Sequence, residues 1–473
     1  MIDRKLRNTS LLVATCFFME NLDGTIVTTA VPQIGESLKA TPSSVSLVIT
    51  SYLLALAVLI PLSGWLTQRF GSRPVFLSAI AIFTLASLGC ALSQSVEQLI
   101  AMRVLQGVGG AMMVPVGRMA VLAHTEKRDI IKVTAYIIWP GLMAPVIAPL
   151  LGGVLTTYLS WHWMFLINIP IGIGAFVAAW RLIDQSDKHA TAPLDVMGML
   201  LTCASLGGLS WGAHMIAEPS LSNATGGVVM LLSAGLLAIA AWHLLRDDAP
   251  LLNLRTLKID TFRAATAGFF VYALVVWSMP FILPLLFQEV FGWTPVRSGA
   301  AVLWIFAGNI AIKPATTWML NRFGFRANMM FATAGVSLSV AAFSLLQRDT
   351  PFAVIAVVAF ISGVFRSIGF TAYNTIAFGD VEKGTQMREA NALYATVQQL
   401  AGALGIVVTM LAITSGVRWG DFLPGDGLAN AYAFAFLVLA VIALVPFLMS
   451  TRTHRTAGDN LRTPLVPKQR QAH

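Results

Sequence analysis

Apolar stretches that are long enough to cross a bilayer recur along the whole chain, and short polar or basic segments separate them. A helix needs roughly 20 apolar residues to cross about 30 Å of hydrocarbon. Fourteen windows of the sequence meet this requirement, and they cover approximately residues 9–31, 45–67, 75–94, 97–121, 133–157, 163–183, 193–217, 225–246, 261–288, 298–320, 328–346, 351–377, 389–415 and 428–451. The pattern predicts an all-α polytopic membrane protein with fourteen transmembrane helices.

Similar segments recur at a nearly constant offset and divide the chain into related halves. "GWLTQRFGSR" from Gly64 returns as "TWMLNRFGFR" from Thr317, 253 residues later, and "QGV" at Gln106 returns as "SGV" at Ser362, 256 residues later. Parallel six-helix halves with a substrate site between them are typical of alternating-access transporters. We therefore expect a six-helix bundle over residues 1–188, two linker helices and a loop over 189–260, a second six-helix bundle over 261–451 and a basic tail over 452–473.

The composition agrees with a membrane protein, and the basic residues give the chain an orientation. Of 473 residues, 56% are hydrophobic and 11% are charged, too few charges to cover a water-soluble globule. If the N-terminus is cytoplasmic, 23 of the 31 Lys and Arg fall on the inner side and only four on the outer side. We therefore expect both termini to be cytoplasmic. The net charge of +9 then reflects this bias, with anionic lipid headgroups as sufficient partners and no nucleic acid.

The sequence lacks the motifs that are typical of several other functional classes. No "GxxxxGK[ST]" motif is present, which argues against an ATP-driven pump. Cys16, Cys90 and Cys203 all fall within predicted helices and indicate no disulfide framework or metal site. The predicted helices carry no Ser-His-acid cluster and no pore-lining ring of charges, so we expect neither an enzyme nor a channel, and no cofactor.

Five motifs in order resemble the major facilitator superfamily. They are "LDGTIVTTAVP", "GWLTQRFGSR", "LIAMRVLQGVGGA", "APVIAPLLGGVL" and "SWHWMFLINIP". Within this superfamily the chain resembles the fourteen-helix drug:proton antiporter branch and its multidrug-transporter-like members in the inner membrane of Gram-negative bacteria. The resemblance implies the major facilitator fold, two six-helix bundles plus two extra linker helices, in a monomer that binds a small-molecule substrate and protons.

The resemblance also implies gating roles for two repeated loops and for the fifth predicted span. The loops join glycines for tight turns with arginines at the cytoplasmic side, and amides replace the family's usual acid. Their candidate residues are Gly64, Gln68, Arg69, Gly71, Arg73, Asn321, Arg322, Gly324 and Arg326. The fifth span resembles the family's antiporter motif, with alanine at two positions that usually hold glycine. Its candidates for an outer seal or hinge are Pro145, Pro149, Gly152 and Gly153.

Two carboxylates, Glu20 and Asp23, lie within the first predicted span, where aliphatic neighbours cannot solvate them. At 1.5 Å per residue, Asp23 lies about 12 Å and Arg103 about 9 Å from the outer ends of their helices. The resemblance implies that these helices are neighbours, so Arg103 would stabilise the ionised Asp23 and lose its partner when Asp23 is protonated. We expect Asp23 to be the principal proton carrier and Glu20 a secondary carrier or a site for a cationic substrate. The reverse assignment and a static ion pair remain open.

The second half carries two cations deep in its helices, Lys313 and Arg366, and no acid at their depth. Lys313 can extend to the inner headgroups. Arg366 would line the cavity, where it could hold an anionic substrate group or close the inner gate. Aromatic and amide residues complete the candidate substrate cavity, namely Trp139, Trp277, Phe270, Tyr373, Asn374, Asn391, Gln398 and Gln399.

Taken together, these features predict a proton-coupled exporter that binds an amphipathic small molecule from the cytoplasm and is reset by inward proton flow. A proton-coupled symporter or a uniporter of a metabolite would share the fold and stays an alternative. The identity and charge of the substrate are not encoded in any single motif, because broad cavities recognise shape and polarity across many helices.

Overall fold

The computed structural model describes residues 4–123, 125, 130–184, 193–217, 223–382, 385–419 and 427–452, and nearly all of these residues are helical. The first helices are α1 (Arg4–Ile26), η1 (Val27–Thr29), α2 (Val31–Leu38), α3 (Pro42–Leu59), α4 (Leu62–Phe70), α5 (Ser72–Ala91), α6 (Val96–Ala123), α7 (Ile130–Tyr158), α8 (Trp163–Leu166) and α9 (Asn168–Leu182). A pair follows, α10 (Val196–Ala217) and α11 (Asn223–Arg246), with the turn η2 (Leu254–Lys258). The last helices are α12 (Asp260–Leu285), the π-helical turn η3 (Leu286–Val290), α13 (Pro295–Ala311), α14 (Lys313–Phe343), α15 (Phe352–Ala377), α16 (Thr385–Trp419) and α17 (Gly427–Arg452).

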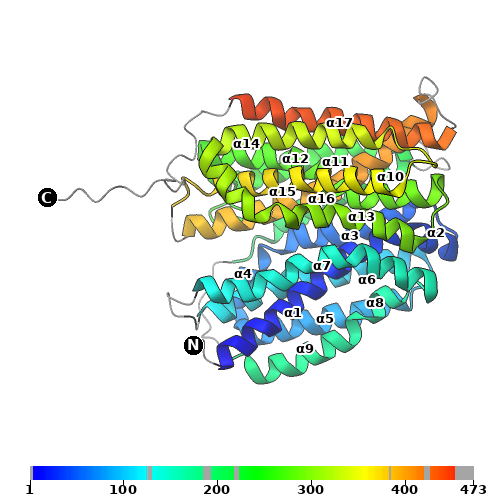
Figure 1. Cartoon of the computed structure of the whole chain (residues 1–473). Coiled ribbons are helices and arrows are strands. Elements are labelled where there is room, and N and C mark those ends of the chain that lie inside the picture. Colours follow the sequence, from blue (N-terminus) through cyan, green and yellow to red (C-terminus); the bar gives the residue numbers. More distant parts are fainter. Residues whose placement is uncertain are drawn as a thin grey trace, which may run out of the picture.

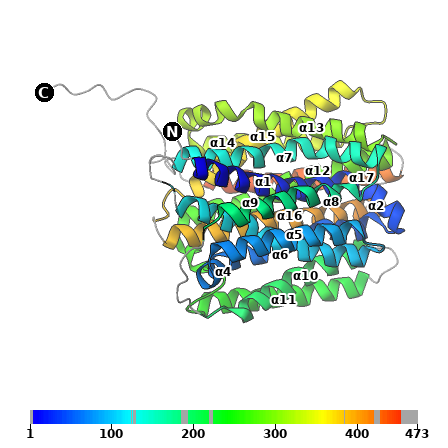
Figure 2. The same ribbon diagram turned by 90° about the horizontal axis from the view of Figure 1, so that it is seen from below.

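The helices lie roughly parallel and form two groups that face each other (Figure 1). Helices α1 to α9 pack mainly among themselves, and helices α12 to α17 do the same. The groups meet along two seams, where α7 contacts α13 and α3 contacts α16. The pair α10 and α11 lies at one edge of the bundle (Figure 2), where α10 contacts both α3 and α16. We name the end where α1 begins and α17 ends the terminal end, and the opposite end the distal end.

The number of spans is compatible with the fourteen predicted from the sequence. Among the described residues, eleven helices are long and apolar enough to cross a membrane, or twelve if α13 and the start of α14 count as one bent span. Two further features correspond to predicted spans that are missing from this count. Helix α7 includes a shorter apolar stretch, Met143–Tyr158, and α14 contains a break at Gly324 that separates two predicted spans.

The span predicted over residues 298–320 is bent, since α13 and α14 meet at an angle of 50°. The bend has a local cause. Pro314 stands at the start of α14, where it removes a backbone donor and its ring clashes with the preceding turn. Hydrophobic periodicity does not register such a bend, so the sequence pattern predicted one continuous span over residues 298–320.

The repeated loops adopt the same backbone conformation in both groups, as the sequence repeat leads one to expect. Gly71 has φ of 91° and ψ of 155°, and Gly324 has φ of 78° and ψ of 168°. L-residues with a side chain rarely adopt such angles, so glycine is required at both turns. Gly64, also expected at a tight turn, lies instead within α4, and a Cβ atom there would meet nothing within 4 Å.

Helices α7 and α13 approach each other closely at their distal ends because glycine faces the partner backbone on both sides. A side chain at Gly153 would collide with the backbone of Pro295 and Val296, and one at Gly299 would collide with the carbonyl group of Pro149. Small residues of this kind let membrane helices pack tightly. The proline- and glycine-rich helix therefore packs closely against the second group at this end, as an outer seal requires.

Candidate functional site

Asp23 and Arg103 form an ion pair in the interior of the first helix group. The Arg103 Nη1 atom donates to Asp23 Oδ2, and both side chains are completely buried. The other carboxylate oxygen, Oδ1, accepts hydrogen bonds from Asn168 Nδ2 at 2.7 Å and from Gln106 Nε2 at 2.9 Å. One polar network thus draws its side chains from four helices, namely α1, α6, α9 and the neighbouring α5. Arg103 thus lies beside Asp23, as expected from the sequence.

The guanidinium of Arg103 is held from several sides. Its Nε atom donates to the Val48 carbonyl oxygen at 3.2 Å, and Nη1 also donates to Gln106 Oε1 at 2.7 Å. The guanidinium carbon of Arg103 lies 4.1 Å from the centroid of the Tyr52 ring. The Nη2 atom has no hydrogen-bond partner among the described residues. A charged group is stable in such a dry interior only when it is paired and hydrogen-bonded, and Arg103 largely meets that condition.

Sequence reasoning missed the amide and hydroxyl groups of this network. Gln106 donates to Ser87 Oγ at 2.7 Å as well as to Asp23, and Asn168 comes from the "FLINIP" motif. Gln106 follows Arg103 by three residues, so it lies on the same helix face. That spacing, together with a polar side chain in an apolar helix, is a signal that the sequence carries. For Asn168 the only signal is a polar residue inside a predicted span, because its contact with α1 depends on tertiary packing.

Glu20 points elsewhere, into a cavity between the two helix groups. This cavity has a volume of about 90 Å³ and is lined by α1 and α3 on one side and α12 and α16 on the other. The Glu20 Oε2 atom is buried and has no hydrogen-bond partner among the described residues. A drug-sized ligand needs a cavity of about 300 Å³ or more, so the described state is contracted. Asp23 does not line this cavity.

Three candidate substrate residues meet Glu20 at this central cavity, namely Trp277, Gln398 and Gln399. The Trp277 indole Nε1 atom is buried without a hydrogen-bond partner in the described part of the chain. Glu20 from α1 and Trp277 from α12 thus line the same cavity, and each carries a buried polar atom without a hydrogen-bond partner among the described residues. A ligand between the helix groups could satisfy both.

Arg366 lies behind Trp277 and not in the cavity wall. Its guanidinium carbon is 5.0 Å from the centroid of the Trp277 ring and 5.3 Å from that of Phe306. The side chain is 6% exposed, and its Nη1 atom has no hydrogen-bond partner among the described residues. The direct exposure to the cavity expected for Arg366 is thus not found in this state, because the indole ring stands between them. Lys313 donates to the Thr371 hydroxyl at 3.3 Å.

The remaining substrate candidates do not converge on the central cavity. Tyr373 is buried within the second helix group, where its hydroxyl lies 3.1 Å from Ser450 Oγ. Asn374 and Asn391 donate to carbonyl groups four residues earlier in their own helices. Phe270 packs against the apolar core. The Trp139 side chain lies outside what the structure describes.

The gating candidates at the terminal end lie mostly on the surface of their own groups. Gln68, Arg69 and Arg322 are exposed, and Asn321 and Arg326 are half-buried. Arg73 donates from Nη2 to the Trp180 carbonyl oxygen at 2.7 Å and lies over the Trp180 ring, so it joins α5 to α9 within one group.

At the distal end, hydrogen bonds join the two groups beside the α7 and α13 contact. Gln33 Nε2 donates to Gln288 Oε1 at 2.8 Å, and Gln288 Nε2 donates to the Thr29 carbonyl oxygen at 3.0 Å. Gly152 packs against Thr29 and Ile26 at the same level. The sequence analysis did not identify this glutamine pair, because each residue stands near the end of a predicted span, where polar side chains are common.

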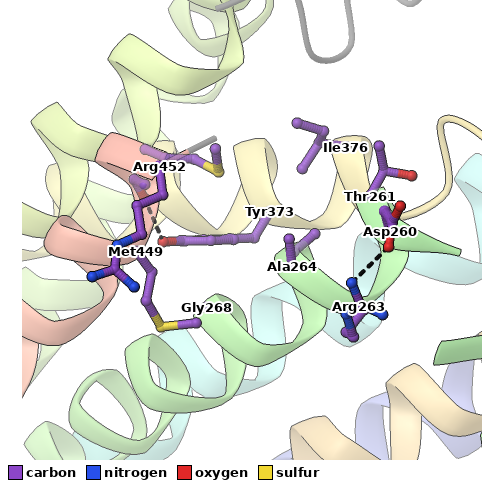
Figure 3. A pocket seen from close by; sticks show the side chains of 12 residues that line it. Asp260, Thr261, Arg263, Ala264, Gly268, Tyr373, Ile376, Met449 and Arg452 are labelled. Atoms are coloured by element: carbon purple, nitrogen blue, oxygen red, sulfur yellow. Dashed lines mark hydrogen bonds and ion pairs between the residues drawn. The ribbon is translucent and has the colours of Figure 1, made fainter. Parts of the chain in front are cut away.

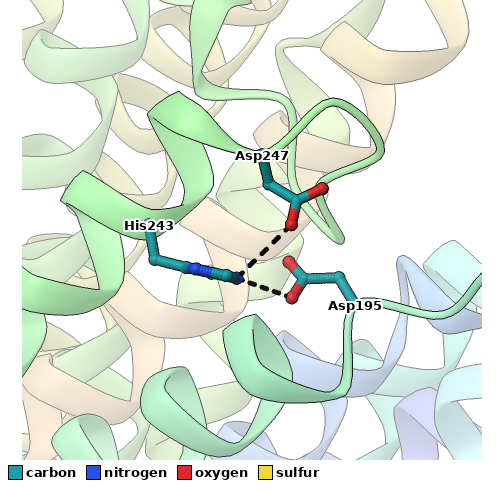
Figure 4. Close-up of side chains that lie close together, drawn as sticks. All are labelled: Asp195, His243 and Asp247. Atoms are coloured by element: carbon teal, nitrogen blue, oxygen red, sulfur yellow. Dashed lines mark hydrogen bonds and ion pairs between the residues drawn. The ribbon is translucent and has the colours of Figure 1, made fainter.

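A cluster of Asp195, His243 and Asp247 at the terminal end of α10 and α11 has the composition of a metal site (Figure 4). Its atoms are already engaged, however. Asp195 Oδ1 accepts from the Gly198 amide at 2.7 Å and lies 2.8 Å from His243 Nε2, and Oδ2 accepts from the Leu251 amide. Burial alone would raise the pKa of Asp195, but these hydrogen bonds outweigh it and lower the pKa. The cluster caps α10 and ties it to α11.

A buried ion pair, a second acid at a cavity and two helix groups that face each other are the features expected of a secondary transporter of small molecules. The sequence matches the model of the Major Facilitator Superfamily over residues 13–406, and the chain belongs to this superfamily. It is accordingly a multi-pass membrane transporter.

Among known proteins the chain is similar to relatives that carry the provisional name multidrug resistance protein MdtD. The relative from Enterobacter sp. (strain 638) is 32% identical over 455 residues, which cover 95% of each chain. The relative from Serratia proteamaculans (strain 568) is 33% identical over 451 residues, with 95% of this chain and 94% of that protein covered.

Solved structures share the fold at low sequence identity. The POT family transporter PepTSo has a TM-score of 0.68 at 14% identity, over 94% of this chain and 98% of that one. The D-xylose-proton symporter has a TM-score of 0.67 at 11% identity, over 95% of this chain and 98% of that one.

Proposed function

We propose that this chain is a proton-coupled exporter of amphipathic small molecules or drugs across the bacterial inner membrane. One observation carries the proposal. Asp23 is held in a dry network with Arg103, while Glu20, one helical turn away, opens on a cavity between the two helix groups. The names of the relatives support the substrate class, and the superfamily supports alternating access.

Asp23 is the proton carrier in this proposal. Protonation of the carboxylate removes its negative charge, so the attraction to Arg103 is lost and Arg103 must find other partners. When the site faces the cytoplasm, the proton leaves Asp23 and the ion pair re-forms. Gln106 and Asn168 hold the ionised carboxylate in place, since both donate to it.

The substrate binds between Glu20 on one side and Trp277 and Gln398 on the other. The contracted volume of the cavity requires the helix groups to separate before a drug-sized molecule fits. Glu20 favours substrates with a cationic or hydrogen-donating group, since its Oε2 atom has no hydrogen-bond partner among the described residues. Arg366 acts through Trp277, whose ring it stacks on, and it comes into reach of the substrate when that ring turns.

The groups move as two six-helix units over residues 1–188 and 261–451, joined by the linker over 189–260. The boundary at 188 and the tail from residue 453 fall outside the described residues. Release to the outside requires the distal contacts at Gly153, Gly299 and Gln288 to open. The loops at Gly71 and Gly324 gate the cytoplasmic side. The terminal end is cytoplasmic because the basic residues gather there, and the chain works as a monomer.

Transport in proteoliposomes tests this function directly. The purified full chain is reconstituted, and an acidic lumen is imposed while a fluorescent lipophilic cation is offered outside. An antiporter accumulates the cation in the acidic lumen in exchange for protons, and a protonophore abolishes this accumulation. Empty liposomes correct for passive uptake.

The same experiment separates the alternative functions. A proton-coupled symporter would drive its substrate out of a loaded acidic lumen, and a uniporter would show no dependence on the proton gradient. A panel of cationic, neutral and anionic compounds is needed, since the sequence does not specify the substrate. If no compound in a broad panel responds to the gradient, the proposed function is wrong.

A further inference from the structure

A second cavity lies within the second helix group at the terminal end, apart from the central cavity (Figure 3). It has a volume of about 280 Å³ and is lined by α12, α14, α15 and α17. No described residue of the first group contributes to its wall. Its size therefore does not depend on separation of the two groups, and it lies at the lower limit for a drug-sized ligand, about 300 Å³.

The wall of this cavity is apolar, and its mouth is basic. Ala265, Gly268, Met329 and Ile376 form much of the wall. Arg263 and Arg452 lie at the first turn of α12 and at the last residue of α17, so both stand where a bilayer has its headgroups. An apolar slot that opens between basic side chains at this level matches one acyl chain below a phosphate group.

The charges at the mouth favour an anionic lipid. Arg263 Nη2 donates to Asp260 Oδ1 at 2.6 Å, whereas Arg452 has no acidic partner among the described residues. Two guanidinium groups and one carboxylate leave an excess of one positive charge. The hydroxyl oxygen of Thr261, also in the wall, is buried without a hydrogen-bond partner in the described part of the chain.

We propose that this cavity is a binding site for an anionic phospholipid, with one acyl chain between α12, α15 and α17 and the phosphate on Arg452. The lipid belongs to the cytoplasmic leaflet if the terminal end is cytoplasmic, and the site itself is independent of the transported substrate. A lipid there would fix the terminal ends of α12 and α17 relative to each other, since both helices contact it.

Native mass spectrometry of the purified full chain tests the site. Phosphatidylglycerol and phosphatidylcholine with identical acyl chains are added separately to delipidated protein in mild detergent. The expected result is one phosphatidylglycerol bound per chain at concentrations where phosphatidylcholine does not bind. Arg452→Gln should lower phosphatidylglycerol occupancy about fivefold, as expected for one basic residue near a membrane surface.

Arg246→Gln is the matched control, because Arg246 is also the last, exposed residue of a helix at the terminal end. It should leave lipid occupancy unchanged. Ala264→Phe keeps both arginines and fills the slot, since Ala264 lines the cavity, and it should abolish retention. Melting curves without added lipid check that all variants are folded.

The proposal is overturned by equal binding of both lipids by the wild-type chain, by an equal loss in Arg452→Gln and Arg246→Gln, or by full lipid retention by Ala264→Phe. Competition by millimolar inorganic phosphate as effective as that by phosphatidylglycerol would also reject it, because the acyl chain would then contribute nothing.

Discussion

Two buried arginines, Arg103 and Arg366, occupy comparable helices in the two halves but have opposite surroundings. Arg103 lies against the carboxylate of Asp23 and a set of amide and carbonyl groups. Arg366 has aromatic rings for neighbours, and the described residues place no carboxylate against it. The charge of the first arginine is compensated by its ion pair. The second is a buried cation without its counter-charge, an arrangement that costs stability and is therefore expected to serve transport.

Substitution of Asp23, the acid that pairs with Arg103, should have the largest effect on transport. Asp23→Asn keeps the size of the side chain but removes the titratable group and replaces one of the two accepting oxygens with an NH2 donor. We expect it to abolish gradient-driven accumulation and substrate-induced proton release. Binding of substrate, measured as quenching of tryptophan fluorescence, should persist.

Membrane abundance of Asp23→Asn must match that of wild type for this comparison. Intact gradient-driven transport by Asp23→Asn, together with its loss in Glu20→Gln, would exchange the proposed roles of the two acids. If neither variant is impaired, proton coupling lies elsewhere in the chain.

Substitution of Arg103 and substitution of Arg366 should have opposite effects on the stability of the protein. Arg103→Met leaves Asp23 buried without its cation and should destabilise the protein by about 3–5 kcal/mol. Arg366→Met replaces an unpaired cation by an apolar side chain of similar length, so its melting temperature should equal or exceed that of wild type. Thermal denaturation in detergent measures both.

Transport assays should distinguish Arg366 from Lys313, the other cation deep in the helices of the second half. Arg366→Met should lose most transport despite its stability, whereas Lys313→Met should retain most of it, since Lys313 donates to the Thr371 hydroxyl. A destabilised but active Arg366→Met protein would contradict the assignment of Arg366 to function.

Much of the contrast between Arg103 and Arg366 was predictable from the sequence, because the contrast depends on local features. Long apolar windows locate the helices, and the repeated loops predict the matching turns at Gly71 and Gly324. The depth of Asp23 and Arg103 along their helices sufficed to predict their contact, once the two helices were taken as neighbours.

What the sequence did not predict depends on packing across helices. Asp23 and Glu20 are only three residues apart, yet the structure directs one into the interior of its helix group and the other into the cavity. Tyr373 was expected in the cavity, but its hydroxyl bonds to α17 instead. Depth along a helix is readable from sequence, whereas the direction of a side chain around the helix requires its neighbours.

A smaller and selective effect is expected at Glu20. Glu20→Gln keeps a hydrogen-bonding group in the cavity and removes a negative charge, so export of cationic compounds should fall while export of neutral compounds continues. Initial rates for a cationic and a neutral compound of similar size, each as a ratio to wild type, measure this. Equal losses for both compounds would assign Glu20 to coupling and not to selectivity.

The smallest effect should come from the outer part of the Asp23 network. Asn168 donates to Asp23 Oδ1 at 2.7 Å and is completely buried. Asn168→Ala removes a hydrogen bond to a charged group, which is worth about 1.5–3 kcal/mol. The loss should lie at the lower end of this range, because Gln106 and Arg103 still hold the carboxylate.

Asn391→Ala provides the control for Asn168, since Asn391 is exposed and, among the described residues, bonds to a carbonyl oxygen of its own helix. Its melting temperature should match that of wild type, and that of Asn168→Ala should be lower. The double variant Asn168→Ala with Asp23→Asn completes a mutant cycle. If Asn168 acts through the carboxylate, its substitution should cost less in the Asp23→Asn background. Strictly additive losses would show that Asn168 stabilises the helix packing independently of the ion pair.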